Sequence, residues 1–372
     1  MKILHLSDLH LGRRLYEVSL LEDQQYILRQ ILDILDRNHA DAVILAGDIY
    51  DKPIPSAEAV CLLDWFLKQL SDRGLSVLMV SGNHDSAERL GFASSLLEHK
   101  GVHVSPVFRG AAGPVVLHDE YGSVNCYLLP FIKPIHAKRV WPDAEIETYT
   151  DAVAEVVRHW SVCTEERNLL VAHQLVTGAV RSESESLSIG GLDDVSAEVF
   201  SIFDYTALGH IHSAQSAGSP YIRYCGTPLA YSFSEADKEK TVTWVDLGPK
   251  GSITVTEQAL KPLHPMRKLR GGFAEIMEIP ITEDYLHITL TDEEDIPHGL
   301  ARLRDRFSNL LSMEYDNLRT RMQEQTVDGG GEDFSPMELL ERFYEQRNGQ
   351  PMSNEQRQLS ETLMEQIWEE QL

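Results

Sequence analysis

The stretch ILHLSDLHLG, residues 3–12, sets an apolar run directly against two polar side chains. Residues 2–7 have the pattern of a buried strand, and Asp8 and His10 stand where that strand ends. Residues two apart in an extended chain point to the same side, so this carboxylate and this imidazole would emerge together. A lone D-x-H pair is common and usually carries no chemistry, so the meaning of this one depends on the rest of the chain.

Four more clusters repeat the pattern: GDIYD (47–51), GNHD (82–85), VAHQL (171–175) and GHIH (209–212). In at least four of the five cases an apolar strand runs directly into the polar residues. Taken singly, each cluster has an ordinary explanation as a turn, an exposed strand end or a core histidine. Sites in layered α/β proteins lie beyond the carboxyl ends of strands, so the five clusters together are expected to converge.

The side chains in these clusters are those of a metal centre with oxygen and nitrogen ligands. Aspartate, asparagine and histidine suit Mn, Fe or Zn, and the lack of thiolates disfavours an iron–sulfur site; Mn²⁺ is the first expectation. The candidates outnumber the ligands that one ion needs, which indicates two ions. Two ions about 3.5–4 Å apart clamp the attacking and leaving oxygens of a displacement at phosphorus. The polar side chains that the five clusters offer are Asp8, His10, Asp48, Asp51, Asn83, His84, Asp85, His173, His210 and His212.

Strands and helices alternate over the first hundred residues, which predicts a parallel sheet layered by helices. One predicted helix covers residues 56–74, with Ser56 as its N-cap and Gly74 at its end. Several strands then follow one another, which favours a sandwich of two sheets. The basic segment 259–272, with two prolines and a glycine pair, marks a boundary. The expected domains are 1–255, a small α/β cap at 256–327, and a linker with C-terminal helices at 328–372.

Composition excludes several classes of protein. The four cysteines are scattered with no C-x-x-C pair, which fits the reducing cytoplasm and argues against a disulfide framework or a zinc ribbon. The sequence contains no run of 18 apolar residues, so no membrane-spanning helix is predicted. The first residues are too polar for a secretory signal. A cytoplasmic protein without membrane association is therefore expected.

The formal net charge of −25 argues weakly against nonspecific binding of nucleic acid. Bound cations would reverse the local sign at the site, however, and a net charge says nothing about patches. Basic residues follow the first and third clusters, and others lie in the segments 133–139 and 261–270. They could equally be solvated surface charges. The candidate DNA contacts among them are Arg13, Arg14 and Arg89.

The five clusters, in this order, resemble the calcineurin-like metallophosphoesterases over roughly residues 1–250. Within that superfamily, HLSDLHLGRRL, GDIYDKPIPS, VSGNHDSAERL and YIRYCGTPLAYSFSE are similar to the SbcD family of bacterial nuclease subunits. The last of these runs is not found in generic phosphoesterases. The resemblance implies a four-layered α/β/β/α sandwich with a two-metal centre, a small α/β capping domain and C-terminal helices.

The resemblance also implies roles for single residues. Asp8, His10 and His212 would bind one ion, Asn83, His173 and His210 the other, and Asp48 would bridge them. His84 would not bind a metal but would stabilise or protonate the leaving oxygen. Asp51 would hold the imidazole of His84 in the right tautomer, although eukaryotic and archaeal relatives tend to have histidine at this position.

The implied function is a metal-dependent DNA nuclease, a 3′-to-5′ exonuclease on duplex ends and an endonuclease on single strands or hairpins. The implied partners are DNA and an SbcC-type ATPase, with a homodimer, formed by helices near residues 59–70, inside a heterotetramer. Two amphipathic C-terminal segments would dock on the ATPase or, alternatively, fold back on their own chain. Their apolar residues are Met337, Leu340, Phe343, Tyr344, Leu359, Leu363, Met364, Ile367, Trp368 and Leu372.

Two other functions remain open from the sequence. A small-molecule phosphodiesterase or phosphatase of the same superfamily would act alone, which leaves the apolar C-terminal segments unexplained. A non-catalytic scaffold with a decayed site disagrees with the presence of all seven candidate ligands and His84. A Ser-His-Asp hydrolase is poorly supported because the chain has no G-x-S-x-G elbow.

Overall fold

The computed structural model divides the chain into two compact units. The first comprises Met1–Leu290 and Ile296–Glu314, and the second comprises Thr291–Asp295 and Tyr315–Leu372. The structure describes residues 1–105, 107–180, 194–317, 336–348, 350–354, 356–360 and 363–364.

The first of two large sheets contains the opening strand of the chain at its centre. Its six strands run in the order β14-β13-β1-β4-β5-β6. Strands β1, β4, β5 and β6 are parallel, and the hairpin of β13 and β14 is added antiparallel to β1. The bounds are β1 (Lys2–Leu6), β4 (Ala42–Ala46), β5 (Ser76–Val80), β6 (Val102–Val104), β13 (Thr241–Leu247) and β14 (Ile253–Ala259).

The second sheet also has six strands, in the order β11-β12-β10-β9-β8-β7. Its four inner strands are parallel, and the edge strands β7 and β11 are antiparallel. The bounds are β7 (Val115–Asp119), β8 (Gly122–Leu129), β9 (Arg167–His173), β10 (Tyr205–Gly209), β11 (Gln215–Ala217) and β12 (Ser219–Tyr224).

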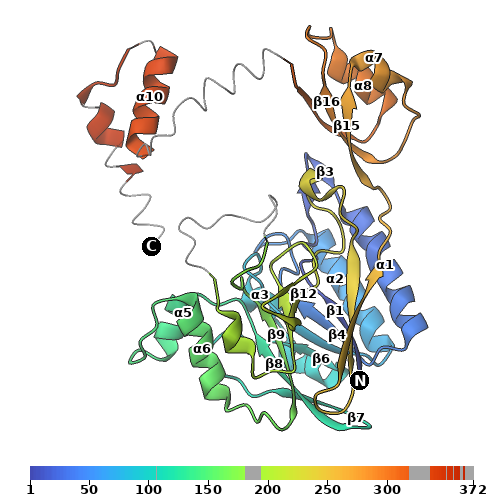
Figure 1. Cartoon of the computed structure of the whole chain (residues 1–372), viewed down its shortest axis with the longest axis vertical. Coiled ribbons are helices and arrows are strands. Elements are labelled where there is room, and N and C mark those ends of the chain that lie inside the picture. The colour runs from blue at the N-terminus through green and yellow to red at the C-terminus, as the bar shows by residue number, and fades with distance from the viewer. Residues whose placement is uncertain are drawn as a thin grey trace. The chain divides into compact units, whose positions relative to one another are not determined.

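The two sheets pack face to face between two layers of helices. Helices α1 (Leu21–Asn38) and α2 (Ala57–Asp72) cover the first sheet, while α6 (Tyr149–Trp160) covers the second with α5 (Pro134–Val140) beside it (Figure 1). A separate apolar cluster fills the space between the sheets. The prediction of a four-layered α/β/β/α fold is therefore confirmed. The clustered residues between the sheets include Ile44, Leu78, Val171 and Ala207.

Helix α2 follows the sequence prediction closely. The side chain of Ser56 accepts a hydrogen bond from the backbone nitrogen of Ala59 at 3.3 Å, as an N-cap does. Gly74 follows the helix with a φ of +71°, a conformation that costs glycine little. Phe66 is buried under the first sheet, whereas Val60 is 44% exposed. Only part of the apolar face of this helix is therefore core.

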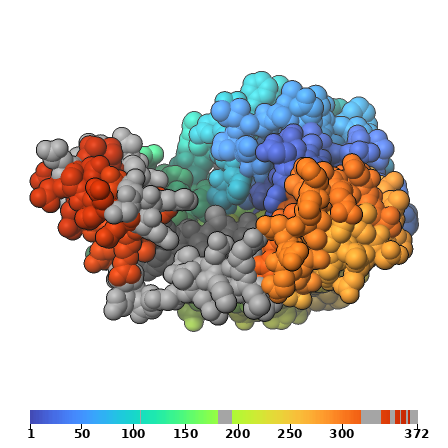
Figure 2. Space-filling model, turned by 90° about the horizontal axis from the view of Figure 1, so that it is seen from above, coloured from blue at the N-terminus to red at the C-terminus, as the bar shows by residue number. Residues whose placement is uncertain are grey.

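The small α/β region after the boundary is built on a three-stranded sheet. Its strands are β15 (Met266–Gly271), β16 (Tyr285–Leu290) and β17 (Leu310–Tyr315), with helices α7 (Phe273–Glu278) and α8 (Gly299–Arg306). These residues, coloured orange, lie beside the blue N-terminal residues in Figure 2.

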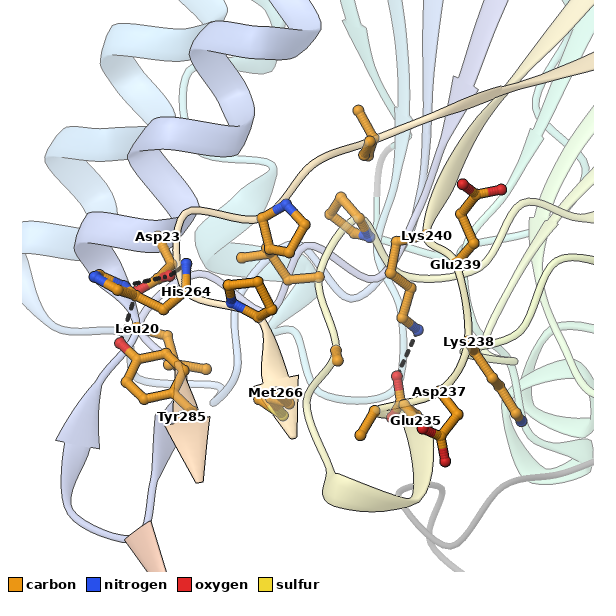
Figure 3. A pocket seen from close by; sticks show the side chains of 17 residues that line it. Leu20, Asp23, Glu235, Asp237, Lys238, Glu239, Lys240, His264, Met266 and Tyr285 are labelled. Atoms are coloured by element: carbon orange, nitrogen blue, oxygen red, sulfur yellow. Dashed lines mark hydrogen bonds and ion pairs between the residues drawn. The ribbon is translucent and has the colours of Figure 1, made fainter. Parts of the chain in front are cut away.

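A buried carboxylate on α1 ties this region to the first sheet's helices. Asp23 accepts hydrogen bonds from the hydroxyl of Tyr285 at 2.8 Å and from the backbone nitrogen of His264 at 3.3 Å (Figure 3). The imidazole Nδ1 of His264 also lies 3.0 Å from this carboxylate. The small region is therefore anchored to the sandwich by polar contacts as well as by apolar packing.

The C-terminal unit contains α10 (Pro336–Asn348), which matches the first predicted amphipathic segment. Leu339 and Phe343 on this helix are exposed, as are Leu359 and Leu363 further on. Ile367, Trp368 and Leu372 of the second predicted segment lie outside the described residues. Among the helices that the structure describes, none combines the length and apolar character needed to cross a membrane.

Truncating the contact between the sheets should destabilise the whole sandwich. Ile44 is completely buried in that contact, so Ile44→Ala is expected to lower the free energy of unfolding by about 2–5 kcal/mol through lost transfer energy and a cavity. Val116→Ala, at a 45% exposed position of β7, is the matched control. Denaturant titration followed by circular dichroism measures both, and similar midpoints for the two variants would contradict this packing.

Candidate metal centre

The five sequence clusters all lie at the carboxyl ends of parallel strands. Asp8 follows β1, Asp48 follows β4, and Asn83 follows β5. His173 ends β9, and His210 comes directly after β10 in the facing sheet. Strands β1, β4 and β5 are neighbours in one sheet, as β9 and β10 are in the other. Because the sheets face each other, their loops meet at one edge of the sandwich.

The structure brings the seven predicted ligands together. The ligand atoms of Asp8, His10 and His212 all lie within 4.8 Å of one another, and those of Asp8, Asp48 and His173 do so too. A third group combines His10 and Asp48 with His84. Asp8, His10 and Asp48 thus each belong to two of these overlapping groups.

Asn83 and His210 complete the second half of the cluster. The side-chain oxygen of Asn83 lies 3.0 Å from Nε2 of His173 and 3.0 Å from Nδ1 of His210. Oδ2 of Asp48 lies 3.4 Å from Nε2 of His173 and 3.8 Å from Nε2 of His10. Asp48 therefore stands between the two halves, the position that a bridging ligand needs.

The buried imidazole of His10 tests whether these residues fit metal ions. Both of its ring nitrogens are buried, and neither has a hydrogen-bond partner among the described residues. A buried polar atom without a partner is costly, and a metal ion would supply that partner. Burial also holds the pKa of His10 well below its ordinary value, so the ring stays in the neutral form that binds metals. The donor set and these ring nitrogens fit a pair of divalent ions.

Buried acids and bases with pKa values shifted in opposite directions lie together in the site. Burial lowers the pKa of His173, but the nearby carboxylates of Asp48 and Asp8 outweigh it and raise the pKa to about 9. Burial raises the pKa of Asp8. For Asp48, the surrounding histidines outweigh burial and hold its pKa below the ordinary value. Several buried acids and bases of opposite tendency in one place are typical of a functional site.

The backbone at the site is held in unusual conformations. Asp8, His10, Asp48 and His210 have φ angles of +51°, +43°, +47° and +106°, in the region that side chains rarely adopt. Each such residue costs about 1–3 kcal/mol and persists only where neighbours enforce it. Here the backbone nitrogen of Asp8 donates to the oxygen of Gly47 at 2.9 Å, and that of His10 donates to the oxygen of Asp48 at 3.0 Å. The loops of β1 and β4 thus hold each other in place.

Three glycines leave the room that the ligands occupy. A β-carbon at Gly47 or Gly209 would overlap His173, and one at Gly82 would overlap Asp48. The G of GDIYD, GNHD and GHIH is therefore a packing requirement at the ends of three strands.

His84 stands at the exposed side of the cluster, in the third of the overlapping groups. Its side chain is 34% exposed, and its Nε2 lies 3.9 Å from Oδ2 of Asp48. Its Nδ1 lies 3.0 Å from the backbone oxygen of Asp51, so the ring donates there and turns Nε2 toward the site. The backbone nitrogen of His84 also donates to the carboxylate of Asp48 at 2.8 Å. The geometry places an orientated imidazole at the open side of the centre.

The structure corrects one detail of the sequence prediction. The backbone oxygen of Asp51, not its carboxylate, contacts the imidazole of His84. The carboxylate instead accepts a hydrogen bond from Arg13 at 2.8 Å. The cause is local: the side chain of residue 51 turns toward the first loop, while its carbonyl faces His84. A backbone oxygen can orient the ring whichever side chain stands at this position.

Of the three predicted DNA contacts, Arg13 already makes contacts within the chain. Besides Asp51, its guanidinium lies 5.8 Å from the ring centre of Tyr231. Arg14 is exposed and donates to the backbone oxygen of Glu17. Arg89 is exposed on the short helix that follows GNHD.

Asp85 has a structural part in the site that the sequence analysis did not assign. Its carboxylate accepts backbone hydrogen bonds from Ile49 at 3.1 Å, Tyr50 at 2.9 Å and Gly82 at 2.9 Å. Burial raises its pKa to about 6. Its position directly after the GNH triplet is the only sequence signal, and it shows that an acid there clamps the loops of β4 and β5 together.

The run YCGTPLAYSFSE forms the layer behind His212. Lys240 donates to the fully buried Glu235 at 2.5 Å (Figure 3). The carboxylate of Glu235 lies 3.4 Å from Nδ1 of His212, and Lys240 also donates to the backbone oxygen of His212 at 3.0 Å. Burial favours the protonated acid, but His212 and Lys240 outweigh it and lower the pKa of Glu235 to about 2. A carboxylate behind a metal-binding histidine fixes its tautomer and orientation.

Two further buried side chains hold the first loop from the same side. The amide of Gln24 donates to the backbone oxygen of His10 at 2.8 Å and to that of Leu9 at 3.2 Å. The hydroxyl of Tyr231 also donates to the oxygen of Leu9. No sequence motif marks Gln24, whose contacts depend on α1 passing behind the first loop.

Comparison with known proteins agrees with this geometry. The calcineurin-like phosphoesterase family matches residues 1–214, more than half of the chain, and the chain belongs to that family. A second family, described as the type 5 capsule protein repressor C-terminal domain, matches residues 262–348. The chain is 31% identical over 372 residues to the SbcD subunit of the nuclease SbcCD from Staphylococcus epidermidis, with 96% of each chain covered. Within the phosphoesterases it is thus a member of the SbcD family of nuclease subunits.

Two solved structures are similar at low identity. A dimetal phosphatase from Danio rerio is 12% identical, with a TM-score of 0.43, and the match covers 71% of this chain and 98% of that one. A Thermus thermophilus protein is 13% identical, with a TM-score of 0.39, and covers 69% and 98% respectively.

Filling the space at Gly82 should damage metal binding. Because a β-carbon there overlaps the side chain and backbone of Asp48, Gly82→Ala is expected to weaken Mn²⁺ binding at least about tenfold in isothermal titration calorimetry. Gly113→Ala is the matched control, since nothing lies within 4 Å of its added carbon. Equal affinities in the two variants would show that Asp48 does not need this space.

Removing the charge behind His212 should also weaken the centre. Glu235→Gln leaves the shape nearly unchanged but removes the charge shared by His212 and Lys240, so we expect an affinity for Mn²⁺ about 10–100-fold lower. Glu239→Gln, an exposed position four residues on, serves as the control. Calorimetry with both variants decides, and unchanged binding by Glu235→Gln would contradict the role of this carboxylate.

Proposed function

We propose that the centre holds two Mn²⁺ ions. Asp8, His10 and His212 bind one ion in this proposal, with the second held by the residues around Asn83. Asp48, which lies within 4 Å of His10 and His173, bridges the two. The unpartnered nitrogens of His10 support metal occupancy, and the oxygen and imidazole donors support Mn²⁺ over softer ions. The residues around the second ion are Asn83, His173 and His210.

The reaction that suits this arrangement is hydrolysis of a phosphodiester. Two bound divalent ions supply Lewis-acid stabilisation of the oxygens at phosphorus and favour ionisation of water. The chain itself contributes His84, whose Nε2 faces the site and whose Nδ1 is engaged by the backbone of Asp51. In the proposed mechanism His84 donates a proton from Nε2 to the leaving oxygen, or stabilises the charge that develops there.

We propose DNA as the substrate. The chain would act as a 3′-to-5′ exonuclease on duplex ends and as an endonuclease on single strands and hairpins, in repair, recombination and replication. The observation that carries this proposal is the convergence of seven ligands and His84 in a chain that matches a nuclease subunit along 96% of its length. A small-molecule phosphodiesterase function would not explain why residues 262–348 match the second family.

The acidic charge of the chain favours a partner that grips DNA. We propose that residues 328–372 bind an SbcC-type ATPase and that residues 256–327 contact DNA, in a heterotetramer built on a homodimer of this chain. The exposed Leu339 and Phe343 on α10 support a docking role. The four cysteines, all free thiols, support a cytoplasmic location.

Replacing His84 should separate chemistry from metal binding. We expect His84→Ala to lower Mn²⁺-dependent cleavage of linear duplex DNA by about 10²–10⁴-fold, because the general acid is lost, with Mn²⁺ affinity retained. His118→Ala, at an exposed position of β7, is the control. The assay runs on the purified chain with and without the ATPase, beside bis-p-nitrophenyl phosphate. Hydrolysis of this ester with no DNA cleavage in any condition would favour a small-molecule phosphodiesterase.

A further inference from the structure

A pocket lined by Asn83 lies directly beside the metal centre. Its volume is about 440 Å³, within the range of pockets that hold small organic groups. The loop after β5 forms one wall, and the segment from Pro130 to Val140, which includes α5, forms another. The backbone nitrogen of Phe131 donates to the oxygen of Ser81 at 2.9 Å, so the two walls are joined at the base.

The wall at α5 carries two cationic side chains, Lys133 directly before the helix and Arg139 within it. His136 lines the pocket too, but burial and the two neighbouring cations lower the pKa of its imidazole. Elsewhere in this acidic chain arginines such as Arg13 and Arg167 are paired with carboxylates. In the described part of the chain, by contrast, no carboxylate lies within ion-pair distance of Lys133 or Arg139. The pocket therefore has two cations on one wall that no described carboxylate pairs with.

The acidic residues of the same pocket do not cancel this charge. The carboxylate of Asp85 is occupied by three backbone nitrogens. Glu88 lies at the exposed rim, where it accepts a hydrogen bond from Ser86 at 3.0 Å. Neither carboxylate therefore pairs with Lys133 or Arg139.

The remaining wall is aromatic. Phe108 and Phe131 are half-buried and line the pocket. The ring of Phe131 also lies 6.3 Å from that of His173, a candidate ligand, so this aromatic wall continues into the metal centre. Cationic side chains beside aromatic faces are the features with which proteins hold single-stranded nucleic acid, because phosphates pair with the cations and bases pack on the rings.

We infer that this pocket is a subsite for the nucleotide next to the scissile phosphate on the cleaved strand. The inference rests on the proposed nuclease function and deepens it. A phosphodiester at the metal centre would continue past Asn83, with its next phosphate facing Lys133 and Arg139 and its base against Phe131. An ester without a nucleotide chain would leave the subsite empty.

The helix supplies its own control for this inference. Lys138 adjoins Arg139 and is exposed, but it does not line the pocket. Lys133→Ala, Arg139→Ala and Lys138→Ala each remove one charge from the same segment. The full chain with Mn²⁺ is assayed on a single-stranded oligothymidylate and on bis-p-nitrophenyl phosphate, and the ratio of the two kcat/KM values is compared.

We expect this ratio to fall about tenfold in Lys133→Ala and Arg139→Ala, as for the loss of one charged contact, and less than about twofold in Lys138→Ala. The salt dependence of oligothymidylate binding should also weaken by about 0.7 in log–log slope for each of the first two variants. Equal ratios in all three variants would overturn the subsite while leaving the nuclease function intact. A wild-type chain that hydrolyses the ester but cleaves no DNA, with or without the ATPase, would overturn both.

Discussion

The buried charge of Asp48 is the constraint on which the rest of the site depends. Its carboxylate lies beneath the surface within 4 Å of three imidazoles and accepts the backbone nitrogen of His84. A carboxylate at this depth is stable only when positive charge or hydrogen bonds compensate it. The chain supplies donors from strand ends in both sheets. The sandwich is therefore held together at this edge by the same groups that would hold metal ions.

The strained backbone around Asp48 is held in place by contacts from buried side chains. Four candidate ligands have left-handed backbone angles, which the chain would not adopt without enforcement. Asp85, Gln24 and Tyr231 provide it by binding the backbone of the loops that carry the ligands. Glu235 and Lys240 do the same behind His212. The inner residues are thus positioned by an outer layer of buried polar side chains, which explains why the YCGTPLAYSFSE run accompanies the five metal motifs.

The charge of the molecule is unevenly distributed. The net charge of −25 makes the chain as a whole repel DNA, and buried carboxylates at the centre add to that repulsion until cations bind. Basic residues that no described carboxylate neutralises remain in the pocket beside Asn83. In the proposed function this pocket would admit a phosphodiester beside the metal centre, and a partner protein would hold the rest of the DNA.

Periodicity and local motifs were enough to predict the strands, the two-sheet sandwich, the N-cap at Ser56 and the convergence of the five polar clusters, among which the family resemblance selected the seven ligands. They sufficed because polar side chains at the ends of parallel strands must meet at one edge, whatever the loops between them do. The contact between His84 and the backbone oxygen of Asp51 could not be predicted in this way, because every residue type has the same backbone carbonyl. Likewise, only the folded chain shows that Arg139 faces a pocket and Lys138 does not. Which side chain of a basic segment reaches a site depends on how its helix is rotated against its neighbours, and long-range packing sets that rotation.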